Sequence, residues 1–144
     1  MIDVKQRGNL TELQCITSFY ELGHKISIPY GENSRYDFIA DIQGILIRVQ
    51  VKTCQLSDDG NSISFPCRST RVNSNGCYHR LYTKEEIDYF CTYHNGKCYL
   101  VPVTECSKVK VLRFLPTKNN KKGGVNYAQD YELSVQVQKL LSME

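Results

Sequence analysis

Several features that would mark particular protein classes are missing from this chain of 144 residues. No apolar run is long enough to span a bilayer, and the first residues, MIDVKQRGN, lack the apolar core of a signal peptide. The seven cysteines form no C-x-x-C pair, and no Walker A pattern for a nucleotide is present. We therefore expect a cytoplasmic protein with no membrane association and no nucleotide cofactor.

The composition is that of an ordinary globular protein. Hydrophobic residues make up 41% of the chain and charged residues 23%. The length allows one domain with a buried core, and no repeat or linker divides residues 1–144. The net charge of +3 is mildly basic, which permits nucleic-acid binding without demonstrating it.

The odd number of cysteines favours reduced, mostly buried thiols over a set of disulfides. A zinc site made by Cys67, Cys77 and His79 is conceivable, but their spacing matches no common zinc motif. Cys91 and His94 are close enough in sequence to form a nucleophile and its base. Both lie in a segment that reads as a strand, so core packing is the better interpretation.

The most informative stretch is residues 36–53, YDFIADIQGILIRVQVKT, in which two apolar runs flank Gln43-Gly44. This pattern predicts two strands joined by a tight turn. Because side chains alternate along a strand, Val49 and Val51 are expected to point into a core.

The same alternation places Gln50 and Lys52 together on the opposite face. The two runs are of similar length, so Asp37 at the start of the first run should return close to both residues. A carboxylate, an amide and an ammonium group at one end of an apolar hairpin suggest a site for a hard metal ion and a phosphate.

Other elements follow from periodicity and turn residues. We expect helices over residues 9–22 and 127–143, a short helical turn at 87–88 after a capping box at Thr83, and strands over 25–30, 62–65, 89–93, 97–103 and 109–115. Two interpretations of Glu12 compete. Asn9 with Glu12 matches a capping box, which spacing alone favours, whereas a helix packed on the hairpin would bring the Glu12 carboxylate to the metal.

Residues 66–82 are basic and contain no acidic residue. They read either as a solvated loop or as a segment that contacts DNA, with arginine for guanine edges or phosphates and asparagine for adenine. A loop this long inside a compact domain is usually functional. The candidate DNA contacts in it are Arg68, Arg71, Asn73, Asn75, His79 and Arg80.

Residues 116–126 form a second basic segment, rich in glycine. Its lysines, Lys118, Lys121 and Lys122, are either solvated or follow a phosphate backbone.

Taken together, these residues resemble the PD-(D/E)XK nuclease superfamily. Tyr36-Asp37 stands where that family has Pro-Asp, and Gln50-Val51-Lys52 stands where it has (D/E)-x-K. Glu12, which follows Arg7-Gly8-Asn9, resembles the helix-1 glutamate of the archaeal Holliday-junction resolvase branch. Residues 87–90 with 99–102 are similar to the small intron-encoded homing endonucleases of the superfamily.

The resemblance implies an α+β fold: a restriction-endonuclease-like core, roughly residues 8–103, with a mixed central sheet flanked by helices. It implies a catalytic set of Glu12, Asp37, Gln50 and Lys52. Mg²⁺, or Mn²⁺ in its place, would be held by Asp37, Gln50, Glu12 and the carbonyl of Val51. Gln50 carries no charge, so metal binding without DNA should be weak.

The resemblance also implies that the partner is double-stranded DNA, with Arg7 as a further contact, and that the protein is a homodimer or homotetramer. The expected function is a metal-dependent, site-specific double-strand endonuclease of homing type. A structure-specific Holliday-junction resolvase is one alternative. The other is a non-catalytic DNA-binding module, which the uncharged Gln50 leaves open.

Overall fold

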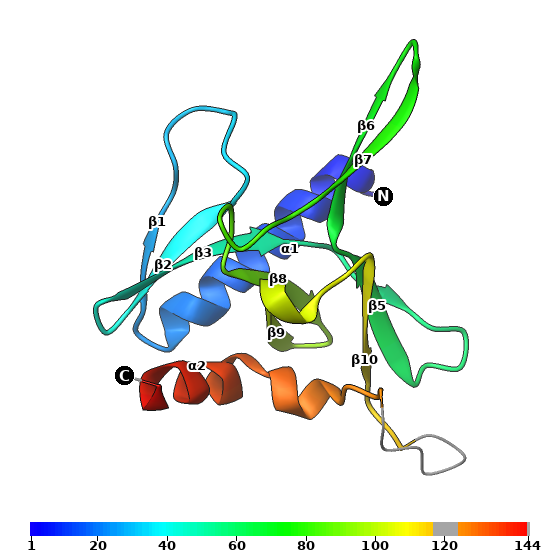
Figure 1. Ribbon diagram of the computed structural model, residues 1–144. Coiled ribbons are helices and arrows are strands. Elements are labelled where there is room, and N and C mark those ends of the chain that lie inside the picture. Colours follow the sequence, from blue (N-terminus) through cyan, green and yellow to red (C-terminus); the bar gives the residue numbers. More distant parts are fainter. Residues whose placement is uncertain (117–123, 144) are drawn as a thin grey trace.

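The computed structural model describes residues 1–116 and 124–143 (Figure 1). The helices are α1 (Val4–Glu21) and α2 (Leu133–Ser142), with short 3-10 helices η1 (Val103–Glu105) and η2 (Ala128–Tyr131). The strands are β1 (Lys25–Ser27), β2 (Phe38–Ile42), β3 (Ile45–Val51), β4 (Gln55–Leu56), β5 (Ser62–Pro66), β6 (Arg68–Asn73), β7 (Gly76–Leu81), β8 (Tyr89–His94), β9 (Lys97–Pro102) and β10 (Val109–Arg113). No helix in these ranges is long and apolar enough to cross a membrane.

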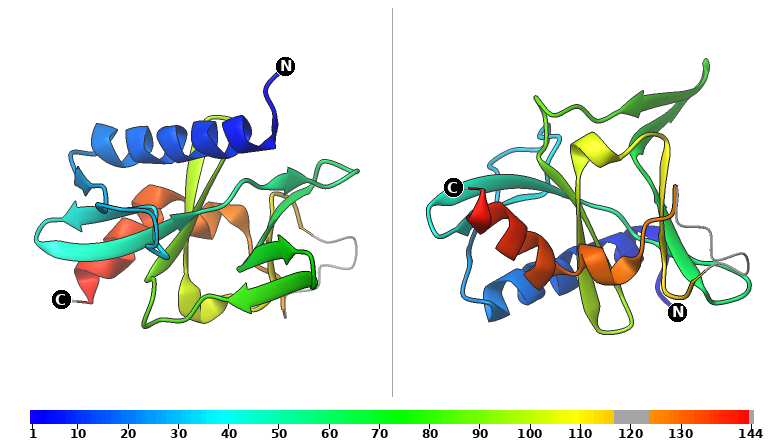
Figure 2. Two further views of the ribbon diagram at one scale, coloured as in Figure 1. Left: turned by 90° about the horizontal axis from the view of Figure 1, so that it is seen from above. Right: turned by 60° about the horizontal axis from the view of Figure 1, so that its bottom comes forward.

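A five-stranded mixed sheet forms the centre, in the order β1-β2-β3-β8-β9. The β3–β8 pair is parallel and the other neighbours are antiparallel. A second sheet has the order β10-β5-β4, and β6 pairs only with β7. Helix α1 packs along the central sheet and α2 packs against β9 (Figure 2). The predicted α+β architecture with a mixed central sheet flanked by helices is confirmed.

The predicted hairpin of residues 36–53 is present as β2 and β3. Its register pairs Ile42 with Ile45 across the turn. Gln43 and Gly44 have φ values of 52° and 92°, the left-handed conformation that a type I′ hairpin turn requires at both central positions. Residues along both strands alternate between buried and partly exposed, as the sequence pattern predicted.

The buried residues fall into two clusters, one on each face of the central sheet. The first joins side chains of both helices, including Phe19 and Leu133, to Phe38, Val49 and Leu100 of the sheet. The second lies between the central sheet and the β10-β5-β4 sheet, and it contains Ile63, Phe65, Phe90, Val101 and Leu112. The central sheet is therefore covered by the helices on one face and, over β8 and β9, by the second sheet on the other.

Helix α1 begins earlier than predicted, because Asp3 caps it. The Asp3 carboxylate accepts a hydrogen bond from the Gln6 N–H at 2.8 Å, and the Gln6 side chain accepts one from the Asp3 N–H at 2.9 Å. Asn9 lies inside the helix, so its prediction as the cap was wrong. Glu12 consequently has no role in capping.

Residues 66–82 were predicted to be a loop, and that prediction was also wrong. They form the antiparallel hairpin of β6 and β7, which projects from the body of the molecule (Figure 1). Every residue of β7 is exposed. With neither face buried along its length, the hairpin has no alternation of apolar and polar residues to reveal it. We call β6 and β7 the ribbon.

Several predicted boundaries also differ. The strand expected over 25–30 ends at Ser27, and the helix expected over 127–143 is divided into η2 and α2. Glu86 accepts hydrogen bonds from the Thr83 N–H and hydroxyl at 3.2 Å, but a turn and no helix follows this capping box. Lys118, Lys121 and Lys122 lie outside the described residues.

Candidate active site

Asp37 is fixed at the open end of the β2–β3 hairpin by two hydrogen bonds. Its N–H donates to the Val49 carbonyl at 2.8 Å, and its Oδ2 accepts from the Val51 N–H at 2.7 Å. The Asp37 side chain thus lies beside the segment that carries Gln50 and Lys52. The convergence expected from the lengths of the two strands is present.

Glu12 reaches the same place from α1. Burial and, second, the negative charge of Asp37 raise the pKa of Glu12. Burial also raises the pKa of Asp37, against the opposing effects of the Val51 N–H and of the Lys52 charge. Two partly buried carboxylates thus lie close together with too little positive charge between them, and a cation would relieve this repulsion.

Contacts between α1 and the chain after β3 hold Glu12 in position. The Thr11 hydroxyl donates to the Arg7 carbonyl at 2.9 Å and lies 3.1 Å from the Thr53 hydroxyl. Thr11 is buried and directly precedes Glu12. This threonine pair was not predicted from the sequence.

Gln50 is turned toward the backbone of its neighbour. Its amide nitrogen donates to the Val51 carbonyl at 3.2 Å. In this orientation the Gln50 amide nitrogen, and not its oxygen, faces the Val51 carbonyl. Both oxygens can bind one cation only after the Gln50 side-chain amide has rotated.

Lys52 links the site to the ribbon. Its ammonium donates to the Arg68 carbonyl at 3.0 Å, at the start of β6. The ammonium also lies 5.1 Å from the centre of the Tyr82 ring. Burial lowers the pKa of Lys52, Asp37 opposes this effect and Arg35 adds to it.

Arg35 is a component of the site that was missed in the sequence. It donates to the Ser69 hydroxyl at 2.8 Å, lies 3.0 Å from the Glu86 carboxylate and stacks 3.8 Å above the Tyr82 ring. Its position two residues before Asp37 was the one available signal, and because residues 35–37 form a bend, strand alternation could not place its side chain. Arg35 brings a second positive charge close to Lys52 and ties the ribbon base to the hairpin.

The donor atoms at this site suit a hard divalent cation. Asp37 and Glu12 offer carboxylates, Gln50 an amide oxygen and Val51 a backbone carbonyl, and Mg²⁺ binds oxygen ligands of these kinds. Burial raises the pKa of both carboxylates, and a bound cation would favour their charged forms. The residues therefore fit the metal implied by the sequence.

The register of the ribbon divides the predicted DNA contacts between its two faces. Arg71 pairs with Tyr78 and Ser69 pairs with Arg80, so Arg71 and Arg80 lie on one face. Arg80 is held by Glu86 at 2.8 Å.

The other ribbon face carries Arg68 and His79, and His79 lies 3.1 Å from the Thr70 hydroxyl. Asn73 and Asn75 are at the ribbon tip, where the Asn73 side chain accepts from the Asn75 N–H at 2.8 Å. Arg7 is exposed in the first turns of α1.

The cysteine-based alternatives find no support. Within the described part of the chain, Cys67, Cys77 and His79 do not bring their ligand atoms together as a group. Cys91 is fully buried, whereas His94 stacks on Phe114, with ring centres 5.5 Å apart. Core packing of Cys91 is confirmed.

The chain is similar to nucleases in two comparisons. A family model described as PD-(D/E)XK endonuclease matches residues 2–134. Among solved structures, the bacterial homing endonuclease I-Ssp6803I is 23% identical, with 98% of this chain and 97% of that chain covered and a TM-score of 0.76. At this identity the likeness concerns the fold. No curated protein sequence matches the chain.

Proposed function

Because the chain belongs to the PD-(D/E)XK endonuclease family, we propose that it is a Mg²⁺-dependent, site-specific double-strand DNA endonuclease of homing type. Mn²⁺ is the proposed substitute ion, and residues 1–144 form one nuclease domain. The observation that carries the proposal is the convergence of Glu12, Asp37 and Lys52 at the open end of one hairpin. The homing assignment draws support from the fold shared with I-Ssp6803I.

In the proposed reaction, Asp37 and Glu12 hold the cation, and the Gln50 oxygen and Val51 carbonyl complete the protein ligands. A bound divalent ion lowers the pKa of a water molecule and neutralises charge on the phosphate. Lys52 orients the attacking water and stabilises negative charge on the phosphate oxygens during attack. Its hydrogen bond to the Arg68 carbonyl limits the positions that its ammonium can take.

We propose the ribbon as the principal DNA-reading element. The major groove of B-DNA is about 12 Å wide and accommodates a two-stranded ribbon. The ribbon is exposed and carries the six predicted contacts Arg68, Arg71, Asn73, Asn75, His79 and Arg80. Its base contacts Lys52 and Arg35, so a ribbon bound to DNA would be joined directly to the cleavage site. Arg7 and the three lysines of residues 116–126 remain predicted phosphate contacts.

Cutting both strands requires two active sites, and in the proposed scheme each chain supplies one. A homodimer with twofold symmetry supplies both and matches a pseudo-palindromic target. A homotetramer would extend the reach of a small chain over a longer target. We propose one of these two assemblies.

One experiment separates this function from the junction-resolvase alternative. Linear duplexes carrying a mapped target and a synthetic four-way junction without it are incubated with the protein and Mg²⁺. A homing endonuclease cuts the duplex at one place and leaves the junction intact. Cutting of the junction alone would replace the proposal with a structure-specific resolvase.

A second experiment tests the non-catalytic alternative, which the uncharged Gln50 motivates. Cleavage and DNA affinity are measured for Lys52→Ala, with Lys84→Ala as a matched control because Lys84 is exposed and outside the site. The proposal requires that Lys52→Ala abolishes cleavage while Lys84→Ala retains it. DNA binding without cleavage by the unmodified chain, in Mg²⁺ and in Mn²⁺, would establish a binding module.

A further inference from the structure

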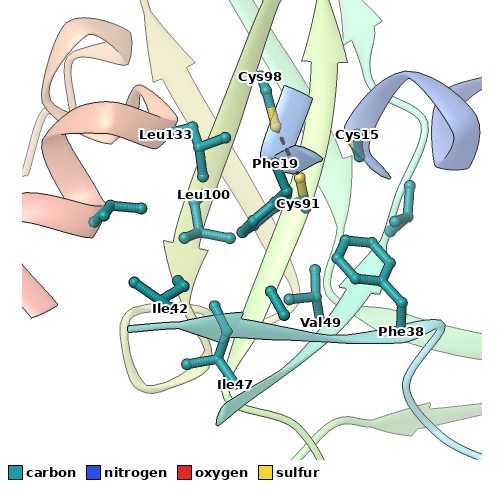
Figure 3. Packing of buried hydrophobic residues seen from close by; sticks show 13 residues of the cluster. Cys15, Phe19, Phe38, Ile42, Ile47, Val49, Cys91, Cys98, Leu100 and Leu133 are labelled. Carbon is teal, nitrogen blue, oxygen red and sulfur yellow. Dashed lines mark hydrogen bonds between the residues drawn. The ribbon is translucent and has the colours of Figure 1, made fainter. Parts of the chain in front are cut away.

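Three cysteines from distant parts of the chain meet inside the first core cluster. Cys15 comes from α1, Cys91 from β8 and Cys98 from β9 (Figure 3). Their sulfur atoms all lie within 4.8 Å of one another, and those of Cys91 and Cys98 are 3.2 Å apart. The two strand cysteines are diagonal neighbours on one face, because Cys91 pairs with Leu100. We call these residues the thiol cluster.

The thiol cluster differs from cysteines that merely fill a core. Cys15 and Cys91 are 0% exposed and Cys98 is 7% exposed, so the cluster opens to solvent through one member. Hydrogen bonds from the neighbouring thiols of Cys15 and Cys91 lower the pKa of Cys98 to about 5. Burial raises the pKa values of Cys15 and Cys91. Because a thiolate is the form that binds metals, an ion entering the cluster would displace the thiol protons.

A surface pocket leads to Cys98. It has a volume of about 220 Å³ and is lined by Cys98 together with Ser18, Glu21 and Glu132. It gives an ion a way in from the surface to Cys98, the one cluster residue that lines it. The Glu132 carboxylate forms an ion pair with Lys97 at the pocket edge. Among the described lining residues, Glu21 has a carboxylate without such a pair.

We propose that Cys15, Cys91 and Cys98 form a binding site for a thiophilic divalent ion of the zinc class, separate from the oxygen-ligand site at Asp37. Three sulfur atoms at about 2.3 Å from one ion would lie about 4 Å apart, so the cluster needs only a small opening of the Cys91–Cys98 contact. Because Cys98 lines the pocket, a water molecule or carboxylate there would be the fourth ligand. Soft thiolate ligands select such ions over Mg²⁺, so the two sites take different metals.

The test is titration of the reduced full chain with Cd²⁺, which reports sulfur ligation through charge-transfer absorbance in the ultraviolet. The proposal predicts a band that saturates at one Cd²⁺ per chain. Cys15→Ala and Cys98→Ala should lower the Cd²⁺ affinity by more than the about 10- to 100-fold typical of losing an outer-shell partner. Cys77→Ala is the matched control, because Cys77 is exposed on the ribbon. A band that is absent, or unchanged in both cluster variants, would overturn the proposal.

A second measurement covers the case in which a cluster variant fails to fold. The unmodified chain is alkylated with iodoacetamide with and without one equivalent of Zn²⁺, and the labelled cysteines are located by mass spectrometry. Zn²⁺ should slow labelling of Cys98 at least tenfold and leave Cys77 unaffected. Equal labelling rates at Cys98 would show that no ion occupies the cluster.

Discussion

Replacing Asp37 with asparagine should change metal binding and stability in opposite directions. The side-chain oxygen of the introduced asparagine would retain the hydrogen bond from the Val51 N–H, which is 2.7 Å long in the structure. The change removes a negative charge that burial disfavours and that raises the pKa of Glu12. Asp37→Asn should therefore make the metal-free protein more stable, although it removes the proposed main metal ligand.

The expected gain is about 0.5–2 kcal/mol, the range of single stabilising substitutions at strained functional sites. For a chain of this length it corresponds to a rise of about 2–6 °C in Tm. Because the pKa of Asp37 is raised from 3.8 in the folded state, the wild-type penalty is present above the folded-state pKa and disappears as the pH falls toward 3.8. The advantage of Asp37→Asn should shrink over the same interval.

The assay is thermal unfolding of wild type and Asp37→Asn in EDTA and in Mg²⁺. At a Mg²⁺ concentration ten times Kd, binding stabilises the wild type by about 1.4 kcal/mol and the variant by much less. The Tm of the wild type should therefore rise toward that of the variant as Mg²⁺ is added. A variant that is less stable than wild type in EDTA at neutral pH would refute the reasoning about undercompensated charge.

Three further predictions concern the ribbon, the helix cap and the metal. Replacing both Arg71 and Arg80 with alanine should weaken DNA binding and reduce the slope of log K against log salt by about 2, and an unchanged slope in a salt titration would remove these two contacts. Asp3→Ala should lower the free energy of unfolding by about 1 kcal/mol in urea denaturation, and the hypothesis of an Asp3 cap fails if Asn9→Ala costs as much. Gln50→Glu adds a carboxylate and should tighten Mg²⁺ binding without DNA in calorimetry, a result that an unchanged Kd would contradict.

The sequence predicts the β2–β3 hairpin well because local and tertiary preferences agree there. Gly44 adopts the left-handed conformation that glycine favours in a tight turn, and the alternating pattern coincides with a strand that is buried on one face. Asp37, Gln50 and Lys52 could be assigned to one place because strand geometry alone fixes their spacing. The same agreement explains why the strands expected over 89–93 and 97–103 are present as the antiparallel pair β8 and β9.

Elements that bury little were the ones missed. The ribbon has exposed residues along both faces. Without burial of one face, apolar residues are not required at alternate positions, so its sequence has no period-2 pattern. The first turn of α1 is likewise exposed, and its start depends on Asp3 and Gln6, not on apolar spacing. Arg35 was missed because its role comes from partners such as Ser69, which is distant in sequence and reaches Arg35 only through the unpredicted ribbon.

The most direct test of the central claim is cleavage of supercoiled and linear genomic DNA by wild type and by Asp37→Ala, each with Mg²⁺ and with EDTA. The structure predicts discrete fragments from the wild type in Mg²⁺, and none in EDTA or from Asp37→Ala, because Asp37 is the carboxylate anchored at the centre of the site. Discrete fragments that persist in EDTA, or from a folded Asp37→Ala variant, would contradict a metal-dependent nuclease centred on Asp37.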